Sequence, residues 1–540
     1  MQPKLPKLPT GIQTFANVRE DGCVYVDKTE YFIDLIDNGN VYFLARPRRF
    51  GKSLTCSTFE SLFQGKKELF KGLYAEEFLN RPNFKPSPVI RLDMSGVATS
   101  EGLEIFKKSI FNIISFIAKD LNIKLQENLL HTDILQYLIK ETYLKYGERV
   151  VLLIDEYDCP YTSYFNKPDM ASAARDILRD FYRQIKISEQ YLRFAFITGI
   201  TKTAKMGIFS TLNNIIDISL EKKYGAICGL TEEELYKYFT PYIELVANEM
   251  EISFKDLMEK IKYYYDGFCF DGEHYLYNPF SFLLFLRQKE FFNYWIGTGT
   301  SKVLADYFKE KNLTVEQFRS LPVSKDLILN PPAEIEIASA ESFLYQSGYL
   351  SLRPSEENGF FTLDYPNTEV LNSMSSLLTQ NILSSKNENE SHYRNDVIDA
   401  LKKEKIEDLV DVFNRLLASI PHNDFDRAAK QDIKYKGYQM TAQEWLCRSC
   451  LLAFLRGCGV FVSGEVQTNR GRADLVIKYS SKFFVLEIKM LPNTAEQALQ
   501  QIIDNDYAKP YPNARILGLA IDGEKRQIVG WDFDKAKCRI

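Results

Sequence analysis

The chain has 540 residues, a net charge of −5, 45% hydrophobic residues and 26% charged residues. This length exceeds what a single hydrophobic core supports, so we expect roughly two to four domains. The charge excludes a simple polycation that coats nucleic acid, although the segment from residue 431 onward has a small excess of Lys and Arg over Asp and Glu. Nine scattered cysteines, and no apolar run of about 18 residues, predict a reduced cytoplasmic protein without a membrane span.

Short apolar runs alternate with amphipathic helical stretches between residues 40 and 230. The expected strands are 41–44, 89–92, 150–154 and 194–197, and the helices between them include 104–121 and 171–187. Strands that are apolar throughout fit burial on both faces. The alternation therefore predicts an α/β domain over 1–230, with a parallel sheet and helices on both of its faces.

A basic loop, RPRRFGKS at 46–53, follows the first expected strand and precedes a helix. It ends like a phosphate-binding loop, in Gly51, Lys52 and Ser53, but Arg46 stands where the usual pattern begins with glycine. Arg46 is compatible with such a loop if its φ is negative. Backbone N–H groups and the helix N-terminus would then hold the phosphates, Lys52 would reach the β and γ oxygens, and Ser53 would bind Mg²⁺. The alternative is a basic turn before a helix.

Two carboxylates end the third expected strand and favour the nucleotide site over the basic turn. Asp155 would hold Mg²⁺ through water, and Glu156 would polarise the attacking water. The next strand ends in polar residues, of which Thr198, Thr201 or Lys202 could sense the γ-phosphate. The residues expected to bind ATP are Arg48, Arg49, Phe50, Gly51, Lys52, Ser53, Leu54, Asp155 and Thr198.

The middle of the chain is mostly helical. Residues 231–395 begin with the capping signature TEEE at 231–234, and 338–375 read as a short helix followed by a hairpin that turns at 356–359. A helix with such a hairpin predicts a winged-helix-like unit. Residues 396–430 form a helical connector, and 431–540 form a last α/β domain.

Two strands of that last domain carry a second set of charged residues. If Ser480 and Ser481 form a two-residue turn, residue 479 pairs with 482, and Asp474 pairs with Glu487 on one face of a hairpin. Lys489 lies two residues further on and shares that face. Two carboxylates this close repel unless a cation lies between them, which suits Mg²⁺ or Mn²⁺. Lys489 would then position the attacking water and stabilise a pentacovalent phosphate. The alternative is a surface ion pair between Glu487 and a lysine.

Motifs along nearly the whole chain resemble the AAA-ATPase-like proteins of bacteria. These are LPTGI at 8–12, YVDKT at 25–29, RPRRFGKS at 46–53, DEYD at 155–158, FS at 209–210, NN at 213–214, YDG at 265–267, YNP at 277–279 and PN at 366–367. The resemblance implies that Arg46 is normal in this loop. Lys202 departs from the family, in which arginine often follows the Thr-Gly turn.

Residues 438–520 resemble the PD-(D/E)XK nuclease superfamily. The resemblance implies that Asp474 and Glu487 are metal ligands, that Lys489 is the catalytic lysine and that Gln501 is an auxiliary residue. Ala473 replaces the proline of the superfamily's name. Glu444 matches a further acidic metal ligand, although it could instead pair with Arg448 one helical turn away, and Glu465 competes for that role.

These features predict an ATP-binding and ATP-hydrolysing protein coupled to a metal-dependent nuclease. Its expected cofactors are ATP and Mg²⁺, with Mn²⁺ as an alternative at the nuclease site. Its expected partner is nucleic acid, DNA before RNA, and it could form a homo-oligomer. The competing hypothesis is a nucleotide-dependent switch whose nuclease-like domain binds partners or nucleic acid without significant cleavage.

Overall fold

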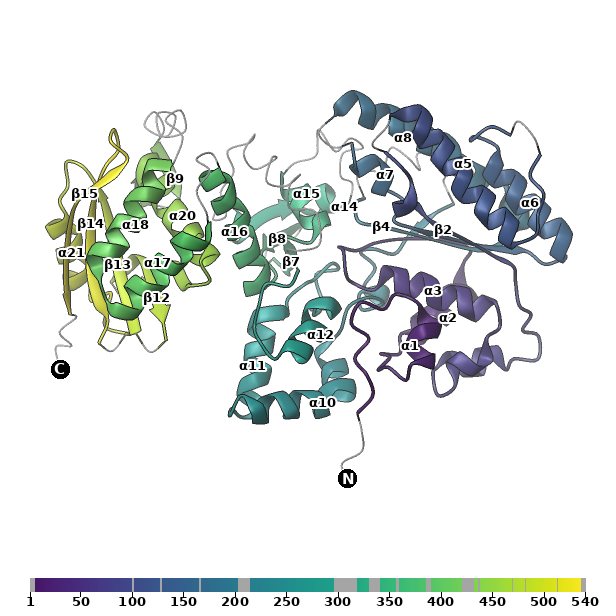
Figure 1. The fold of residues 1–540 in the computed structure, drawn as a ribbon, viewed down its shortest axis with the longest axis horizontal. Helices are drawn as coiled ribbons and strands as arrows, with labels where there is room; N and C mark the ends of the chain where they lie inside the picture. The colour runs from purple at the N-terminus through teal and green to yellow at the C-terminus, as the bar shows by residue number, and fades with distance from the viewer. Residues whose placement is uncertain are drawn as a thin grey trace. The chain divides into compact units, whose positions relative to one another are not determined.

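Figure 1 shows the fold in a computed structural model. The structure describes residues 5–99, 102–126, 129–164, 167–202, 214–295, 318–329, 340–355, 359–384, 390–419, 432–435, 438–468, 470–480, 482–511 and 513–535. The expected turn residues 356–358 and Ser481, and the motif residues 209, 210 and 213, lie outside this part of the chain. The chain divides into two compact units: unit 1 comprises Met1–Thr298 and Phe318–Glu369, and unit 2 comprises Gly299–Gln317 and Val370–Ile540.

A five-stranded parallel sheet forms the centre of unit 1. Its strands are β1 (Val41–Ala45), β2 (Val89–Asp93), β3 (Val150–Asp155), β4 (Leu192–Gly199) and β5 (Ile216–Asp217), in the order β2-β3-β4-β1-β5. The four strands expected from the sequence are confirmed. Every residue of β1 and β3 is buried, as expected for strands covered on both faces. The order places the carboxyl ends of β1, β4 and β3 side by side, where parallel sheets bind ligands.

Helices cover both faces of this sheet, which confirms the predicted α/β architecture. Figure 1 shows one layer on each side. The first layer contains α1 (Phe15–Glu20), α2 (Thr29–Asn38), α3 (Lys52–Phe63) and α4 (Ala75–Leu79), and the second contains α5 (Leu103–Asp120), α6 (Ile134–Tyr146) and α8 (Pro168–Ile187). The short helix α7 (Cys159–Thr162) follows β3. The helices expected at 104–121 and 171–187 correspond to α5 and α8.

The rest of unit 1 is helical and then forms a small sheet. It contains α10 (Glu232–Glu249), α11 (Phe254–Tyr265), α12 (Pro279–Gln288), β6 (Leu321–Ser324), α14 (Lys325–Leu329), α15 (Ala340–Ser347), β7 (Ser351–Pro354) and β8 (Phe360–Asp364). Thr231 and Glu234 form the predicted capping box of α10. The expected helix and hairpin are α15 with β7 and β8, and β6 adds an unpredicted third strand beside β8.

Unit 2 is built around a five-stranded mixed sheet in the order β11-β12-β13-β14-β15. Its strands are β11 (Phe461–Thr468), β12 (Gly471–Tyr479), β13 (Lys482–Met490), β14 (Arg515–Asp522) and β15 (Gln527–Lys535), and only β13 and β14 pair in parallel. Before the sheet come α16 (Thr368–Ser384), α17 (Glu390–Lys403), α18 (Ile406–Ser419), β9 (Asp432–Tyr435), β10 (Tyr438–Thr441) and α20 (Ala442–Gly457); α21 (Ala495–Asp504) lies between β13 and β14.

Two hydrophobic cores cover the two faces of this sheet. On one face, α17, α18 and α20 pack against Leu475, Ile477, Phe484, Leu486 and Ile488, the apolar face of the hairpin. On the other face, α21 packs against Val476 and Val485. Nowhere in the described ranges is a helix both long and apolar enough to cross a bilayer.

Candidate functional site

The loop between β1 and α3 ends at the carboxyl edge of the parallel sheet of unit 1. Gly51 caps α3 with a φ of 96°, a backbone conformation that side chains other than glycine rarely adopt. No side chain caps the first turn of α3, so its N–H groups face the loop without an internal acceptor. A helix N-terminus with open N–H groups is suited to bind phosphate.

Arg46 replaces the first glycine of the usual loop by turning its side chain into the protein. It is 1% exposed. Its guanidinium donates to the carbonyls of Ala45 (2.9 Å) and Ser219 (2.7 Å), with longer bonds to Tyr224 and Gly225 (3.4 Å each). The positive-φ residues of the loop are Arg49 (67°) and Gly51, and Arg46 is not among them. The condition set by the sequence for arginine at this position is therefore met.

Lys52, the first residue of α3, bonds back to its own loop. Its ammonium donates to the carbonyls of Arg46 and Pro47, each at 2.9 Å. Burial lowers the pKa of Lys52, although Asp155 and Glu156 oppose that shift. A triphosphate would offer the same ammonium charged oxygen acceptors in place of two neutral carbonyls.

The two acids at the end of β3 have different surroundings. Asp155 is buried, and its Oδ1 accepts hydrogen bonds from the Thr198 hydroxyl (2.6 Å) and the Glu156 N–H (3.1 Å). Glu156 has a φ of 52° and lines the cavity beside the loop. Burial raises the pKa of Glu156, and Lys52 partly offsets the effect. Glu156 therefore lines the cavity, whereas Asp155 does not.

The three residues proposed as γ-phosphate sensors make different contacts. Thr198 donates to Asp155, as described above. The Thr201 hydroxyl donates to Asp158 (2.8 Å), and the Lys202 ammonium lies 3.3 Å from Asp217. None of the three lines the cavity, so the sensor role stays a prediction.

A cavity of about 370 Å³ lies next to the loop. It is lined by six of the residues expected to bind ATP, together with Glu156; these six are Arg48, Arg49, Gly51, Lys52, Ser53 and Leu54. Apolar residues complete the lining, among them Pro9, Ile12, Pro279, Phe280 and Leu283, and the Arg49 guanidinium lies 4.7 Å from the centre of the Phe280 ring. These apolar residues were not predicted as site residues, although two of the motifs that carried the resemblance, at 8–12 and 277–279, contain three of them.

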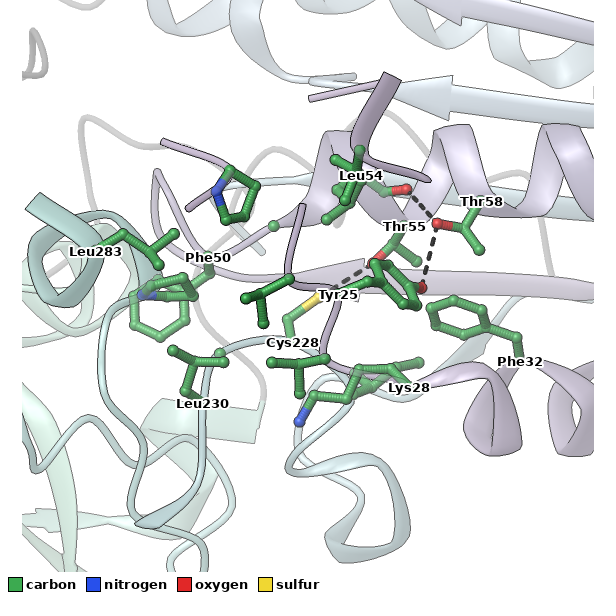
Figure 2. Close-up of a pocket in the computed structure, with 18 of the residues that line it drawn as sticks. Tyr25, Lys28, Phe32, Phe50, Leu54, Thr55, Thr58, Cys228, Leu230 and Leu283 are labelled. Atoms are coloured by element: carbon green, nitrogen blue, oxygen red, sulfur yellow. Dashed lines mark hydrogen bonds between the residues drawn. The ribbon is translucent and has the colours of Figure 1, made fainter. Parts of the chain in front are cut away.

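A second, smaller cavity of about 110 Å³ shares Pro9, Gly51, Leu54, Pro279 and Leu283 with the first. Figure 2 shows its mostly apolar lining, including Phe32, Phe50, Leu230 and Leu283. Of its polar groups, Tyr25 bonds to Thr58 (3.5 Å) and Thr55 to Cys228 (3.6 Å), while Lys28 forms an ion pair with Glu234. The Phe50 ring packs against Phe268 and Phe270, and Phe50 does not line the larger cavity.

The carboxylates of unit 2 lie at one end of the β12–β13 hairpin. The predicted register is confirmed from the pair Tyr479–Lys482 to the pair Leu475–Leu486. The ladder stops there because Asp474 Oδ2 accepts the N–H of Ile488 at 2.8 Å. This side-chain bond replaces the next backbone bond.

Glu487 is at the centre of the group and is only 2% exposed. Its Oε1 accepts hydrogen bonds from Gln501 Nε2 (2.5 Å) and Lys489 Nζ (3.2 Å). Its Oε2 is buried and has no hydrogen-bond partner. A buried carboxylate oxygen without a donor is costly unless a proton or cation is bound to it.

Asp474 faces a buried arginine on α20. Arg448 lies 3.6 Å from Asp474 Oδ1 and 2.8 Å from Glu465 Oε1, and Arg472 lies 3.5 Å from Glu465 Oε2. Arg448 is therefore engaged with Glu465 and Asp474. From the sequence, Arg448 was expected only as a partner for Glu444, and its contact with Asp474 was not predicted.

The acids hold protons more tightly than isolated carboxyls. Burial, reinforced by Asp474, raises the pKa of Glu487 to about 8. Burial also raises the pKa of Asp474 and of Glu444, and Asp474 adds to the effect on Glu444. Burial lowers the pKa of Lys489, but Glu487 and Glu444 outweigh it, so the pKa ends above its ordinary value. A divalent cation would relieve the repulsion between the two acids.

The donor set fits one divalent cation held by Asp474 and the open Oε2 of Glu487, with water completing the shell. Over the described residues, no three His, Cys, Asp or Glu side chains come together closely enough to hold a metal. The role of Glu444 as a further ligand therefore stays a prediction.

Two family models match the chain: "Predicted AAA-ATPase" over residues 9–209 and "PD-(D/E)XK nuclease superfamily" over residues 442–531. A protein from Azotobacter chroococcum mcd 1, described as an uncharacterized protein in the vnfD 5' region, is 33% identical over 537 residues, which cover 97% of this chain and 98% of that protein.

Similar solved structures include the ORC2 protein of Aeropyrum pernix in ADPNP–ADP complexes. It is 11% identical, covers 70% of this chain and 96% of its own, and has a TM-score of 0.27. Cdc6p from Pyrobaculum aerophilum is 13% identical, with 71% and 97% coverage and a TM-score of 0.25. We draw nothing from similarities this low. The family matches and the full-length relative show that the chain belongs to the AAA-ATPase-like family of bacterial proteins and carries a PD-(D/E)XK nuclease superfamily domain.

Proposed function

We propose that the protein binds and hydrolyses ATP in unit 1 and uses a divalent metal in unit 2 to cleave phosphodiester bonds in nucleic acid. We take DNA before RNA as the substrate because of the nuclease resemblance. The observation that carries the nuclease proposal is the buried, unpartnered Oε2 of Glu487 beside Asp474, Lys489 and Gln501.

The large cavity of unit 1 supports the nucleotide proposal. Its lining combines the open N-terminus of α3 with Arg48, Arg49 and Lys52, which suits a triphosphate. Its apolar residues suit a nucleoside base, and the smaller cavity extends the apolar surface available to it. A Mg²⁺ ion bound with ATP would supply charge neutralisation at the phosphates, and Ser53 and Asp155 would hold it.

Each residue near the triphosphate has a distinct task in this proposal. Lys52 would leave its two loop carbonyls and bind β and γ oxygens. Glu156 would orient and polarise the attacking water from the cavity wall. Thr198 would fix the Asp155 carboxylate through the 2.6 Å hydrogen bond.

The residues of unit 2 would divide the nuclease task similarly. When bound, Mg²⁺ or Mn²⁺ would act as a Lewis acid on the phosphate oxygens. Asp474 and Glu487 would hold the ion, and Gln501 would fix the orientation of Glu487. The ammonium of Lys489 would position the attacking water and stabilise the negative charge that develops on the phosphate.

The ATPase part is tested with two variants that separate binding from hydrolysis. We expect Lys52→Ala to weaken ATP binding by at least about tenfold, because an ammonium–phosphate contact is lost. We expect Glu156→Gln to bind ATP normally but to hydrolyse it about 10²–10⁴ times more slowly. Lys66→Ala, at an exposed position beyond α3, is the matched control. Normal hydrolysis by Glu156→Gln would exclude the role given to Glu156.

The nuclease part is tested with labelled DNA and RNA in Mg²⁺ or Mn²⁺. We expect the wild type to cleave, Glu487→Gln to lose at least about 100-fold in rate, and the exposed α21 control Glu496→Gln to behave as the wild type. Nucleic-acid binding without cleavage by the wild type would instead favour the switch hypothesis.

A further inference from the structure

We propose that Arg448 limits the carboxylate site of unit 2 to a single divalent cation, because it holds a fixed positive charge against Asp474. This inference rests on the proposed nuclease function. It concerns how many ions the site takes and which residue sets that number.

The oxygens of Asp474 and Glu487 have different surroundings. Asp474 Oδ2 accepts the Ile488 N–H at 2.8 Å, and Asp474 Oδ1 lies 3.6 Å from the Arg448 guanidinium. Glu487 Oε1 accepts from Gln501 and Lys489. Glu487 Oε2 is buried without a hydrogen-bond partner. The cation position therefore lies at Glu487 Oε2, and the far side of Asp474 faces a positive charge.

Arg448 is held firmly in its position. Its side chain is 3% exposed, and it lies on α20 directly after Cys447, which is fully buried in the core of unit 2. Its guanidinium also pairs with Glu465 at 2.8 Å, and Arg472 holds the other oxygen of Glu465. A buried guanidinium that left these partners would become an unpaired buried charge, so we expect it to stay.

A second ion would meet this fixed charge. Two-metal sites hold their ions about 3.5–4 Å apart, usually with a carboxylate between them. Asp474 would have to bridge the two ions, yet its Oδ1 already faces Arg448, and Lys489 adds a second positive charge. Over the described residues no three acids lie close enough together to hold a metal ion, and the nearby Glu465 is paired with Arg448 and Arg472. The positive charges of Arg448 and Lys489 therefore stand where a second cation would otherwise balance the acids.

The test counts Mn²⁺ ions bound to nucleotide-free, full-length protein by electron paramagnetic resonance. We expect the wild type to bind one ion that is lost in Glu487→Gln, with no spin-coupled pair. In Arg448→Met, which removes the guanidinium and leaves the two acids that it faces, Glu465 and Asp474, available as ligands, we expect two such ions with a spin-coupled signal. Arg448→Lys, which keeps the charge, should bind one.

Two results would overturn the inference. One is a wild type that binds two ions sensitive to Glu487→Gln, a measurement that needs no folded Arg448 variant. The other is an Arg448→Met variant with wild-type circular dichroism and melting temperature that still binds one ion. If instead the wild type binds no ion that depends on Glu487, both the inference and the proposed nuclease fail, which separates this case from the first two.

Discussion

The side chain of Arg46 stabilises the phosphate loop in a way that the glycine of the usual pattern cannot. The glycine of the usual pattern leaves space beside the loop, whereas the Arg46 side chain fills that space and ties the loop to the carbonyls of Ser219, Tyr224 and Gly225. Its guanidinium also lies 4.7 Å from the centre of the Phe270 ring. Arg46 therefore holds the loop on the side of the protein interior, and the other side of the loop stays open to the cavity.

Replacing Arg46 by the usual glycine should therefore weaken the protein. We expect Arg46→Gly to lower the free energy of unfolding by roughly 2–5 kcal/mol, because it leaves buried carbonyls without donors and opens a cavity. Arg48→Gly should leave stability nearly unchanged and weaken ATP binding instead, since Arg48 lines the nucleotide cavity. Denaturant titration and nucleotide binding measured on both variants check this. Equal stability of Arg46→Gly and wild type would contradict it.

The sequence predicted the site residues that belong to short patterns. Lys52, Asp155 and Glu156 follow strands of the expected sheet, and the register of a two-residue turn placed Asp474 near Glu487. Arg448 was missed because its partner Glu465 lies on another element, and no local spacing signals a contact between a helix and a strand. Pro9 and Phe280 were missed for the same reason: they line one cavity from distant parts of the chain.

At the scale of elements, local sequence patterns predicted the strands and helix ends that depend on neighbouring residues. The runs of apolar residues predicted β1 to β4, and the capping signature at Thr231 predicted the start of α10. By contrast, β6 has only four residues, one of them Pro322, and it pairs with β8 far along the chain. A short edge strand that contains a proline has almost no sequence pattern that identifies it as a strand. The end of the β12–β13 ladder at Asp474 could not be predicted from the sequence either, because a side-chain hydrogen bond ends it.

The first turn of α16 contains a buried acid that should make stability depend on pH. Burial raises the pKa of Glu369 to about 8, even though its Oε1 accepts the Trp295 N–H at 2.9 Å. Between the ordinary pKa of 4.5 and about pH 8, the folded state holds a proton that the unfolded state has released. Stability should therefore be highest below that window and fall as pH rises through it, by at most about 1.4 kcal/mol per pH unit.

Denaturant titrations at several pH values between 5 and about 9 check this expectation. Glu369→Gln, which keeps the shape without the charge, should flatten the fall in unfolding free energy. Glu77→Gln, at an exposed position of α4, should leave it as in the wild type. A slope that Glu369→Gln does not change would assign the pH dependence to other groups.

At the scale of the whole molecule, the chain joins two compact units with different chemistry, and the boundary between them falls within α16. The finer division at residues 230, 395 and 430 stays a prediction. The nucleotide loop is in contact with later parts of unit 1: the Arg48 carbonyl accepts the Trp295 indole N–H at 3.4 Å, and a Cβ at Gly348 would come within 2.6 Å of the Pro47 ring. A change in the conformation of the loop would therefore alter its contacts with Trp295 and Gly348.

We propose that ATP binding, rather than its hydrolysis, is the signal to the nuclease. Binding would draw Lys52 away from the carbonyls of Arg46 and Pro47 and so alter the loop that contacts Trp295 and Gly348. We expect ATP to raise the DNA cleavage rate of the wild type and of Glu156→Gln at least about tenfold, a difference worth about 1.4 kcal/mol between the two states. Lys52→Ala should stay at the rate without nucleotide, and Lys66→Ala should respond as the wild type. Cleavage by Glu156→Gln with ATP at the Lys52→Ala rate would show that hydrolysis is required, and equal rates in all variants would show that the two units work independently.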